Sequence, residues 1–299
     1  MSVDPNAGTL VGPSDVLDVS KLVDAFFSQK PDVSVAAQRV SFGTSGHRGC
    51  AFDTTFNEDH IVAIVQAVCR YRQAHGIDGP LFVGRDTHAV SEPAFQVTLE
   101  VLAANGVTAM VDDKNSVTPT PVVSRAIIVH NTGRTEGRAD GIIITPSHNP
   151  PEDGGIKYNP PHGGPAETEI TSWIESLANK LLKEGLKDVR RLPRTQVASQ
   201  IVTYDYLNKY ITQLESIVDM EVVRSSGLHI GVDPLGGAAV HYWAPIADRF
   251  KLNLTVTDDT IDPTFRSIPR DWDGKIRMDC SSKYPMQRLL AIKDRFDIA

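Results

Sequence analysis

Residues 141–157 read GIIITPSHNPPEDGGIK, an apolar run that ends abruptly in a loop rich in proline and glycine. The run from Gly141 to Thr145 predicts a buried strand, because strands covered on both faces read as continuous apolar segments. Open α/β sheets bind ligands just beyond the carboxyl ends of their strands, which is where Ser147 would lie. Prolines on both sides restrict the backbone, so we expect Ser147 to be a nucleophile or phosphate carrier. An ordinary loop serine is the alternative.

Strand-like and helix-like segments alternate from about Phe42 onward, which is typical of an α/β fold. Caps and apolar spacing predict helices that begin after Asn57, near Ser91 and near Thr118, and a fourth over residues 167–184. The segments expected to be strands are 81–83, 107–111 and 141–145.

Residues 187–195 are charged and poor in apolar side chains, which indicates a linker, and a helix is expected from about Tyr204 to Val218. Beyond them, residues 228–233 resemble residues 81–86, and each segment precedes a helix-like stretch and another strand. The matched spacing favours two related α/β domains over a chance match.

Composition limits the function. The 299 residues suffice for about two domains, and a net charge of -7 argues against a nucleic-acid surface. The chain begins without a signal-peptide pattern, and its apolar runs are too short to span a membrane. Three scattered cysteines suggest neither a disulfide framework nor a zinc site. We expect a cytoplasmic protein with small-molecule partners, and neither a nucleic acid nor a membrane among them.

Several motifs together resemble the phosphoglucomutase family of the α-D-phosphohexomutase superfamily, in its bacterial form. They are TPSHNP at 145–150 with KYNP at 157–160, FGTSGHRG at 42–49, GVDPLGG at 231–237 and IRMDCSS at 276–282. The resemblance implies two related α/β domains, each with a small mixed, mostly parallel sheet flanked by helices. It divides the chain into an N-terminal extension with a helix (1–40), domain I with the serine loop (41–195) and a truncated domain II (200–299).

The resemblance implies that phosphate moves between the 1- and 6-hydroxyls of glucose, a hexose phosphate, through glucose 1,6-bisphosphate. Ser147 would carry the phosphate, Arg48 would grip it with a planar guanidinium, and Lys157 would be the general acid/base. His148 is either a phosphate or substrate contact or a structural histidine. Further candidates for phosphate or substrate binding are Thr44, Ser45, Gly46 and Asn149. The alternative for Thr44 and Ser45 is a hydroxyl-rich turn without function, and for Asn149 a side chain that only holds the turn.

The family holds Mg²⁺ with a D-x-D-x-D-R loop and one oxygen of the seryl phosphate, here on Ser147. This chain has no such loop, since Asp271-Trp272-Asp273 stops at two carboxylates. In the family the metal loop follows a segment like residues 293–299, so we expect the ligands, and domains III and IV, to lie beyond Ala299. Catalysis by this chain alone should then be very weak.

Two other functions are weighed. A serine hydrolase would carry its nucleophile in G-x-S-x-G, whereas Ser147 has Thr145 and Asn149 at the flanking positions. A sugar-phosphate binding module without turnover would keep the same motifs. Phosphate on Ser147 would favour the mutase.

Overall fold

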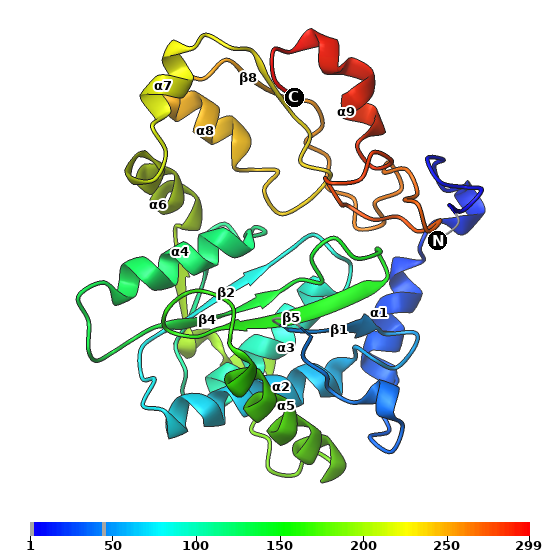
Figure 1. Cartoon of the computed structure of the whole chain (residues 1–299). Helices are drawn as coiled ribbons and strands as arrows, with labels where there is room; N and C mark the ends of the chain where they lie inside the picture. Colours follow the sequence, from blue (N-terminus) through cyan, green and yellow to red (C-terminus); the bar gives the residue numbers. More distant parts are fainter. Residues whose placement is uncertain (1–2, 44–45) are drawn as a thin grey trace. The chain divides into compact units, whose positions relative to one another are not determined.

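The computed structural model describes residues 3–43 and 46–299 (Figure 1). Contacts between Cα atoms divide the chain into two compact units. The first unit comprises residues 18–147 and 152–206, and the second comprises residues up to Leu17, 148–151 and 207–299. Each unit is described by itself.

The first unit is built on a six-stranded sheet with the order β1-β5-β4-β2-β3-β6. The strands are β1 Gly46–Cys50, β2 Leu81–Arg85, β3 Ala109–Asp112, β4 Asp140–Ile144, β5 Asp153–Asn159 and β6 Ile201–Tyr204. β4, β2, β3 and β6 run parallel, and β5 is antiparallel to both of its neighbours. The sheet is therefore mixed and mostly parallel, as predicted.

Helices cover both faces of this sheet, with α4 on one face and α2, α3 and α5 on the other (Figure 1). The helices are α1 Val19–Ser28, α2 Glu58–Ala74, α3 Ser91–Ala104, α4 Thr120–Asn131 and α5 Thr168–Lys183. Short 3-10 helices in this unit are η2 Ala36–Gln38, η3 Arg194–Gln196 and η4 Ala198–Gln200.

Helix α2 begins and ends where the sequence predicts. Asn57 is its N-cap, and Gly76 follows its end at φ +63°, a conformation that glycine adopts readily. The apolar spacing of α2 predicted one buried face, but the structure buries more of the helix than that face. His60 and Gln66 are buried together with the predicted apolar positions, because α3 and α5 both pack against this helix.

Three strands were not predicted: β1, β5 and β6. β1 and β5 contain several glycines and lack the alternation of apolar and polar residues that identifies a strand. β6 follows the stretch expected to be linker, and the expected helix starts later, as α6 Tyr206–Gln213 followed by η5 Leu214–Ser216. Each of the three strands pairs with a strand that is distant in sequence, and β5 also pairs with its neighbour β4.

The expected linker is fastened to the first unit. Arg191 pairs with Glu58 of α2 at 2.7 Å and with Glu100 of α3 at 2.6 Å. The Leu192 amide also donates to the Glu100 carbonyl (3.2 Å). One guanidinium thus ties this segment to two helices.

The second unit contains a parallel pair of strands, β7 Ile230–Val232 and β8 Leu254–Val256. Its helices are η1 Pro13–Asp15, α7 Met220–Ser225, α8 Trp243–Phe250, α9 Gln287–Ile292 and η6 Lys293–Arg295. The order β7–α8–β8 repeats β2–α3–β3, in line with the predicted repeat. Residues before Leu17 group with this unit, and the Asp4 amide donates to the Trp272 carbonyl (2.8 Å).

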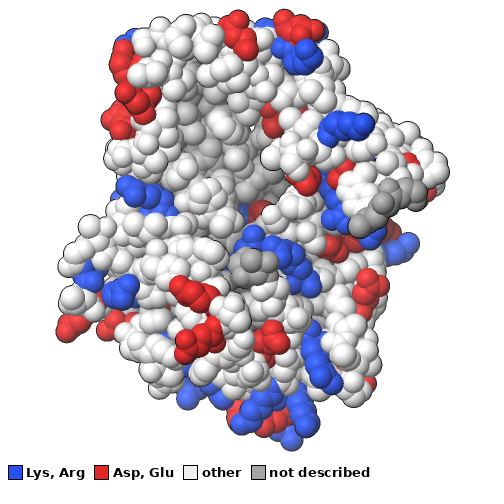
Figure 2. All heavy atoms as spheres, in the orientation of Figure 1, with Lys and Arg blue, Asp and Glu red and all other residues white. Residues whose placement is uncertain are grey.

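Two small apolar cores stabilise the second unit. One contains Leu235, Phe265, Ile268 and Ile276, and the other contains Ile211, Leu214 and Phe250. On the face that Figure 2 presents, acidic and basic side chains are interspersed. Within residues 3–43 and 46–299, none of the helices has both the length and the apolar character needed to cross a membrane.

Candidate active site

Ser147 lies in the turn of a hairpin between β4 and β5. β4 ends at Ile144, and β5 returns antiparallel to it from Asp153. The sequence predicted that this loop could fold back, and the pairing brings Lys157 opposite Ile143 of β4. The serine and the lysine therefore belong to one hairpin.

The backbone at Ser147 adopts a rare conformation. Its φ is +75°, in the left-handed region, which costs a residue other than glycine about 1–3 kcal/mol. The Ser147 amide donates to the Thr145 hydroxyl (2.9 Å), which holds this turn. The side chain of Ser147 is exposed, and its hydroxyl has no hydrogen-bond partner among the described residues. The strained backbone thus presents an exposed hydroxyl just after a buried strand, where a ligand at the edge of the sheet has access to it.

Arg48 lies next to this turn. Its Nε donates to the carbonyl of Pro146 (3.1 Å), the residue just before the serine. Within the described part of the chain, the terminal guanidinium nitrogens have no other hydrogen bond, so they are available to an anion. In the β1–β5 pairing Arg48 is opposite Gly155, so its side chain shares a face with that of Lys157.

Lys157 is half-buried, and no described residue accepts a hydrogen bond from its ammonium group. Burial lowers the pKa of Lys157, and the charge of Arg48 lowers it further, while Asp86 acts in the opposite direction. A lysine with a lowered pKa is more readily available as a neutral base. Arg48 and Lys157 thus lie on the same face of the sheet, and the charge of Arg48 acts on Lys157.

Asp86, which the sequence did not single out, lies just past β2 and carries a hydrogen-bond network. Its carboxylate accepts from the His88 amide (3.0 Å), His88 Nδ1 (3.0 Å) and the Ser91 hydroxyl (2.6 Å). Burial by itself would raise the pKa of Asp86. His88, Ser91 and Thr145 act in the opposite direction, and the pKa of Asp86 is lowered overall. The sequence offered one signal for Asp86, which is a carboxylate placed just after the carboxyl end of a predicted strand.

His148 and Asn149 group with the second unit. In that unit His148 is half exposed, with Nε2 4.0 Å from the Asp279 carboxylate, and its carbonyl accepts from the Met278 amide (3.3 Å). Asn149 is partly buried and has an interaction partner.

The motif at 42–49 contains a buried histidine, His47, that holds neighbouring backbone in place. Thr44 and Ser45 lie outside the described residues. His47 is buried, with Nε2 2.8 Å from the Thr55 carbonyl and Nδ1 3.2 Å from the Ser41 amide. These contacts suit a neutral ring protonated at Nε2. Burial and the neighbouring His60 lower the pKa of His47 to about 4.

Residues 39–184 match the family described as phosphoglucomutase/phosphomannomutase, alpha/beta/alpha domain I. This chain carries domain I of the phosphoglucomutase/phosphomannomutase family. A phosphoglucomutase of Komagataeibacter xylinus is 52% identical over 300 residues, which take in 100% of this chain and 54% of that protein.

Other phosphoglucomutase/phosphomannomutase relatives are more distant. The cytoplasmic phosphoglucomutase of Solanum tuberosum is 34% identical over 216 residues, 67% of this chain and 35% of that protein. The chain thus spans about half, or less, of the length of these relatives. A crystal structure of a putative phosphomannomutase from Thermus thermophilus superimposes with a TM-score of 0.66 at 22% identity, over 85% of this chain and 51% of that one.

The open form of pp63/parafusin, a phosphoglucomutase from Paramecium, gives a TM-score of 0.66 at 20% identity, over 90% of this chain and 50% of that one. At these identities, the two solved structures show the fold.

The Mg²⁺ expected for a phosphoglucomutase/phosphomannomutase does not fit the described residues. Outside positions 1–2 and 44–45, no group of three or more His, Cys, Asp or Glu side chains could hold a metal ion. Asp271 accepts from the Ser282 hydroxyl (2.5 Å), and Asp273 pairs with Arg277 (2.8 Å), so both carboxylates have protein partners.

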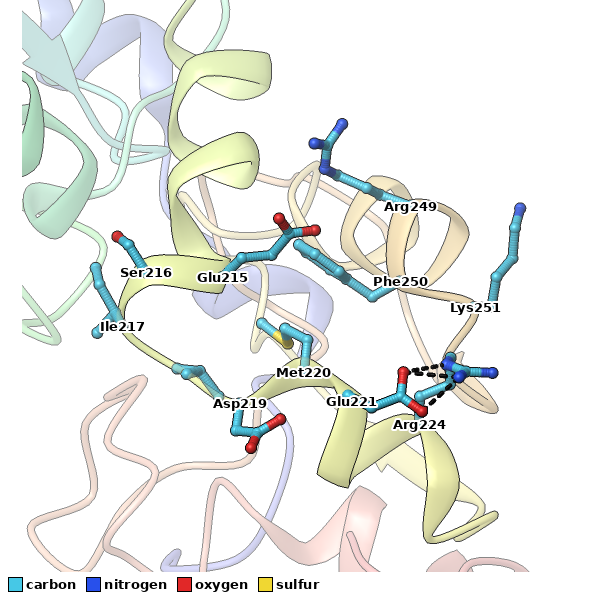
Figure 3. A pocket seen from close by; sticks show the side chains of 11 residues that line it. Glu215, Ser216, Ile217, Asp219, Met220, Glu221, Arg224, Arg249, Phe250 and Lys251 are labelled. Carbon is cyan, nitrogen blue, oxygen red and sulfur yellow. Dashed lines mark hydrogen bonds and ion pairs between the residues drawn. The ribbon is translucent and has the colours of Figure 1, made fainter.

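A hollow of about 650 Å³ lies in the second unit, away from these family motifs. Figure 3 shows Met220 and Phe250 among its lining residues, with Glu221 and Arg224 joined by an ion pair at its rim. It is formed by residues 215–221, 224 and 249–251, and its polar groups lie on the surface. Its lining includes Ser216 and Lys251, but neither Ser147 nor Lys157.

Proposed function

We propose that this chain carries the phosphoserine site of a phosphoglucomutase, which interconverts glucose 1-phosphate and glucose 6-phosphate through glucose 1,6-bisphosphate. One observation carries the proposal. The exposed Ser147 hydroxyl follows the buried strand β4, next to the Arg48 guanidinium, which bonds to the Pro146 carbonyl. The 52% identity to a phosphoglucomutase favours glucose as the sugar.

The residues have separate roles in the transfer. A sugar hydroxyl attacks the phosphorus of phosphoserine 147, the bond between phosphorus and Oγ breaks, and Lys157 takes the proton of the attacking hydroxyl. In the reverse direction Lys157 returns the proton and Ser147 regains the phosphoryl group. Arg48 compensates the charge on the phosphate oxygens. Further phosphate or substrate contacts proposed here are Thr44, Ser45, Gly46, His148 and Asn149.

We propose that full mutase turnover requires a protein as long as these relatives. The K. xylinus phosphoglucomutase is nearly twice as long as this chain, and sugar recognition and Mg²⁺ binding are assigned to such additional domains. Alone, the chain should show negligible mutase turnover, although Ser147 could still take up phosphate. A cytoplasmic location is proposed from the name of the S. tuberosum relative.

A serine hydrolase fits the hairpin poorly. A nucleophile elbow joins a strand to a helix, whereas β4 is followed by the antiparallel strand β5. A non-catalytic sugar-phosphate binding module would bind the ligand without becoming phosphorylated, so phosphorylation of Ser147 is the deciding measurement.

The test incubates the chain with glucose 1,6-bisphosphate and follows its intact mass. We expect one phosphoryl group on the wild-type chain, located on Ser147 by peptide mapping, and none on Ser147→Ala. A wild-type chain that binds the bisphosphate but gains no phosphate would support the binding module and overturn the proposal. Labelling of Ser147 by a serine-directed fluorophosphonate without phosphate uptake would support a hydrolase.

A further inference from the structure

We propose that Glu175 and Asn179 of α5 are positioning residues, which place Arg48 for phosphoryl transfer by holding the backbone at 40–42 beside β1. The inference rests on the proposed function. It concerns how the guanidinium next to Ser147 is placed, rather than which residue carries the phosphate.

The two side chains lie one turn apart on α5 and bind the same short segment. Asn179 bonds to Val40 in both directions: its Oδ1 accepts from the Val40 amide (2.9 Å), and its Nδ2 donates to the Val40 carbonyl (2.8 Å). Glu175 Oε2 accepts from the Phe42 amide (2.8 Å). Asn179 therefore exchanges a pair of hydrogen bonds with Val40, as a residue of a neighbouring strand would.

The segment held by α5 is joined to the start of β1. Phe42 and His47 form an antiparallel bridge, and the Gly43 amide donates to the Gly46 carbonyl (3.0 Å). The Ser41 amide donates to Nδ1 of the buried His47 (3.2 Å). Because three successive residues bond to the beginning of β1, a shift of the segment would carry β1 with it.

Arg48 directly follows this bridge in β1. Its Nε donates to the Pro146 carbonyl (3.1 Å), so the backbone of β1 decides where the guanidinium meets the serine turn. In the ladder with β5 it faces Gly155, and the next residue of β1 faces Gly154. Glycine weakens a strand because it has no side chain to pack, so the contacts with α5 give β1 a support that this ladder lacks.

The bonds to α5 are hard to replace. Val40 is buried, and a buried backbone group without a partner is costly, so the segment would move toward other partners if Asn179 were lost. The helix itself is fixed, since it packs against α2 and buries Ile174 and Ala178 completely. The two side chains thus project from a rigid element toward the segment that they hold.

Four variants separate this support from general stability. Glu175→Leu and Asn179→Leu remove the bonds to the segment, whereas Glu175→Gln keeps an acceptor and removes only the charge. Asn131→Leu is the matched control, because Asn131 of α4 holds the buried Ala139 in the same way. Its Oδ1 accepts from the Ala139 amide (2.7 Å), and its Nδ2 donates to the Ala139 carbonyl (2.8 Å). Ala139 precedes β4, at the end of the strand away from the serine turn.

Two readouts are followed on the whole chain: the rate of Ser147 phosphorylation over a range of glucose 1,6-bisphosphate concentrations, and hydrogen–deuterium exchange at residues 46–48. In Glu175→Leu and Asn179→Leu we expect a higher half-saturating concentration, a maximal rate slower by about ten- to a hundredfold, and faster exchange. Glu175→Gln and Asn131→Leu should keep the wild-type rate and the wild-type exchange at 46–48.

Arg48→Met shows whether Glu175 acts through Arg48. In that background Glu175→Leu should change the phosphorylation rate by no more than about twofold, because the side chain that Glu175 places is already absent. The same fold loss with and without Arg48 would overturn the inference.

Wild-type rates in Glu175→Leu would also overturn the inference, even if Asn179→Leu failed to fold. So would equal slowing in Asn131→Leu, because the effect would then be a general loss of stability. A wild-type chain that takes up no phosphate would overturn the proposed function instead. Exchange would then still decide about the support, and unchanged exchange at 46–48 in Glu175→Leu would count against it.

Discussion

Gly46 lies directly opposite Lys157 in the antiparallel pairing of β1 with β5, and the structure leaves no room there for a side chain. A Cβ at position 46 would come within 2.8 Å of Lys157 Cγ and would also run into the carbonyl of Ile156. The absence of a side chain at Gly46 therefore decides the path that the lysine takes toward the serine turn. Its proposed role in phosphate binding is additional to this steric role.

Gly46→Ala should displace Lys157 and slow phosphorylation of Ser147 by roughly tenfold or more, because transfer depends on close positioning. The rate can be measured by intact mass after mixing with glucose 1,6-bisphosphate. Gly43→Ala is the control, since a Cβ there would meet, among the described residues, only the Gly46 carbonyl at 3.9 Å, an ordinary contact. Equal rates for Gly46→Ala and the wild type would contradict the steric role.

Lys157→Met should reduce the phosphorylation rate by about 10²–10⁴, the usual contribution of a general acid/base. Lys157→Arg should not restore it, because a guanidinium stays protonated. In the wild type the rate should fall as the pH rises through a value below the usual lysine pKa of 10.5, because Lys157 must be protonated to return a proton to the sugar oxygen, and burial and Arg48 lower its pKa. Initial rates across a pH series test this. Lys180→Met, at an exposed site on α5, should leave them unchanged.

Acid should destabilise the first unit through His47. Its pKa is about 4 when folded and 6.5 when unfolded, so protons bind preferentially to the unfolded chain between these values. The stabilisation is fully present above pH 6.5 and is lost as the pH falls toward 4, by at most about 3 kcal/mol. Urea unfolding at pH 7 and pH 5 should show the loss. His47→Gln, although less stable at pH 7, should show a shallower pH dependence; an unchanged slope would rule out His47 as the source.

Arg191→Ala should lower the free energy of unfolding by about 1 kcal/mol, because it breaks two ion pairs that are only partly exposed. The effect should shrink at high salt. Arg190→Ala is the neighbouring control, because its exposed side chain forms no ion pair among the described residues. Equal stabilities of the two variants would mean that Arg191 does not fasten the segment.

Local sequence patterns predicted much of the first unit. The apolar run of β4 and the caps of α2 and α5 depend on neighbours within a few residues, and these elements lie within one or two residues of their expected bounds. Ser147 was identified for the same reason. A serine between a buried strand and a proline-rich turn can be recognised without knowing what lies beside it.

β1 and β5 could not be predicted in this way. Their extended form depends on pairing Gly46 with Lys157 across a long separation in sequence, and glycine-rich segments carry little local preference for a strand. The same pairing sets Arg48 and Lys157 on one face. Sequence identified both residues, and the sheet register decided that they face the same site.

The sequence by itself determined where the helices and the apolar strands of the first unit form and which hydroxyl is the candidate nucleophile, because caps, apolar runs and turn residues act over short distances. Only the tertiary structure decided what lies beside that hydroxyl. Arg48 reaches the Pro146 carbonyl because β1 pairs with β5, and strand order arises from packing the whole sheet between its helices.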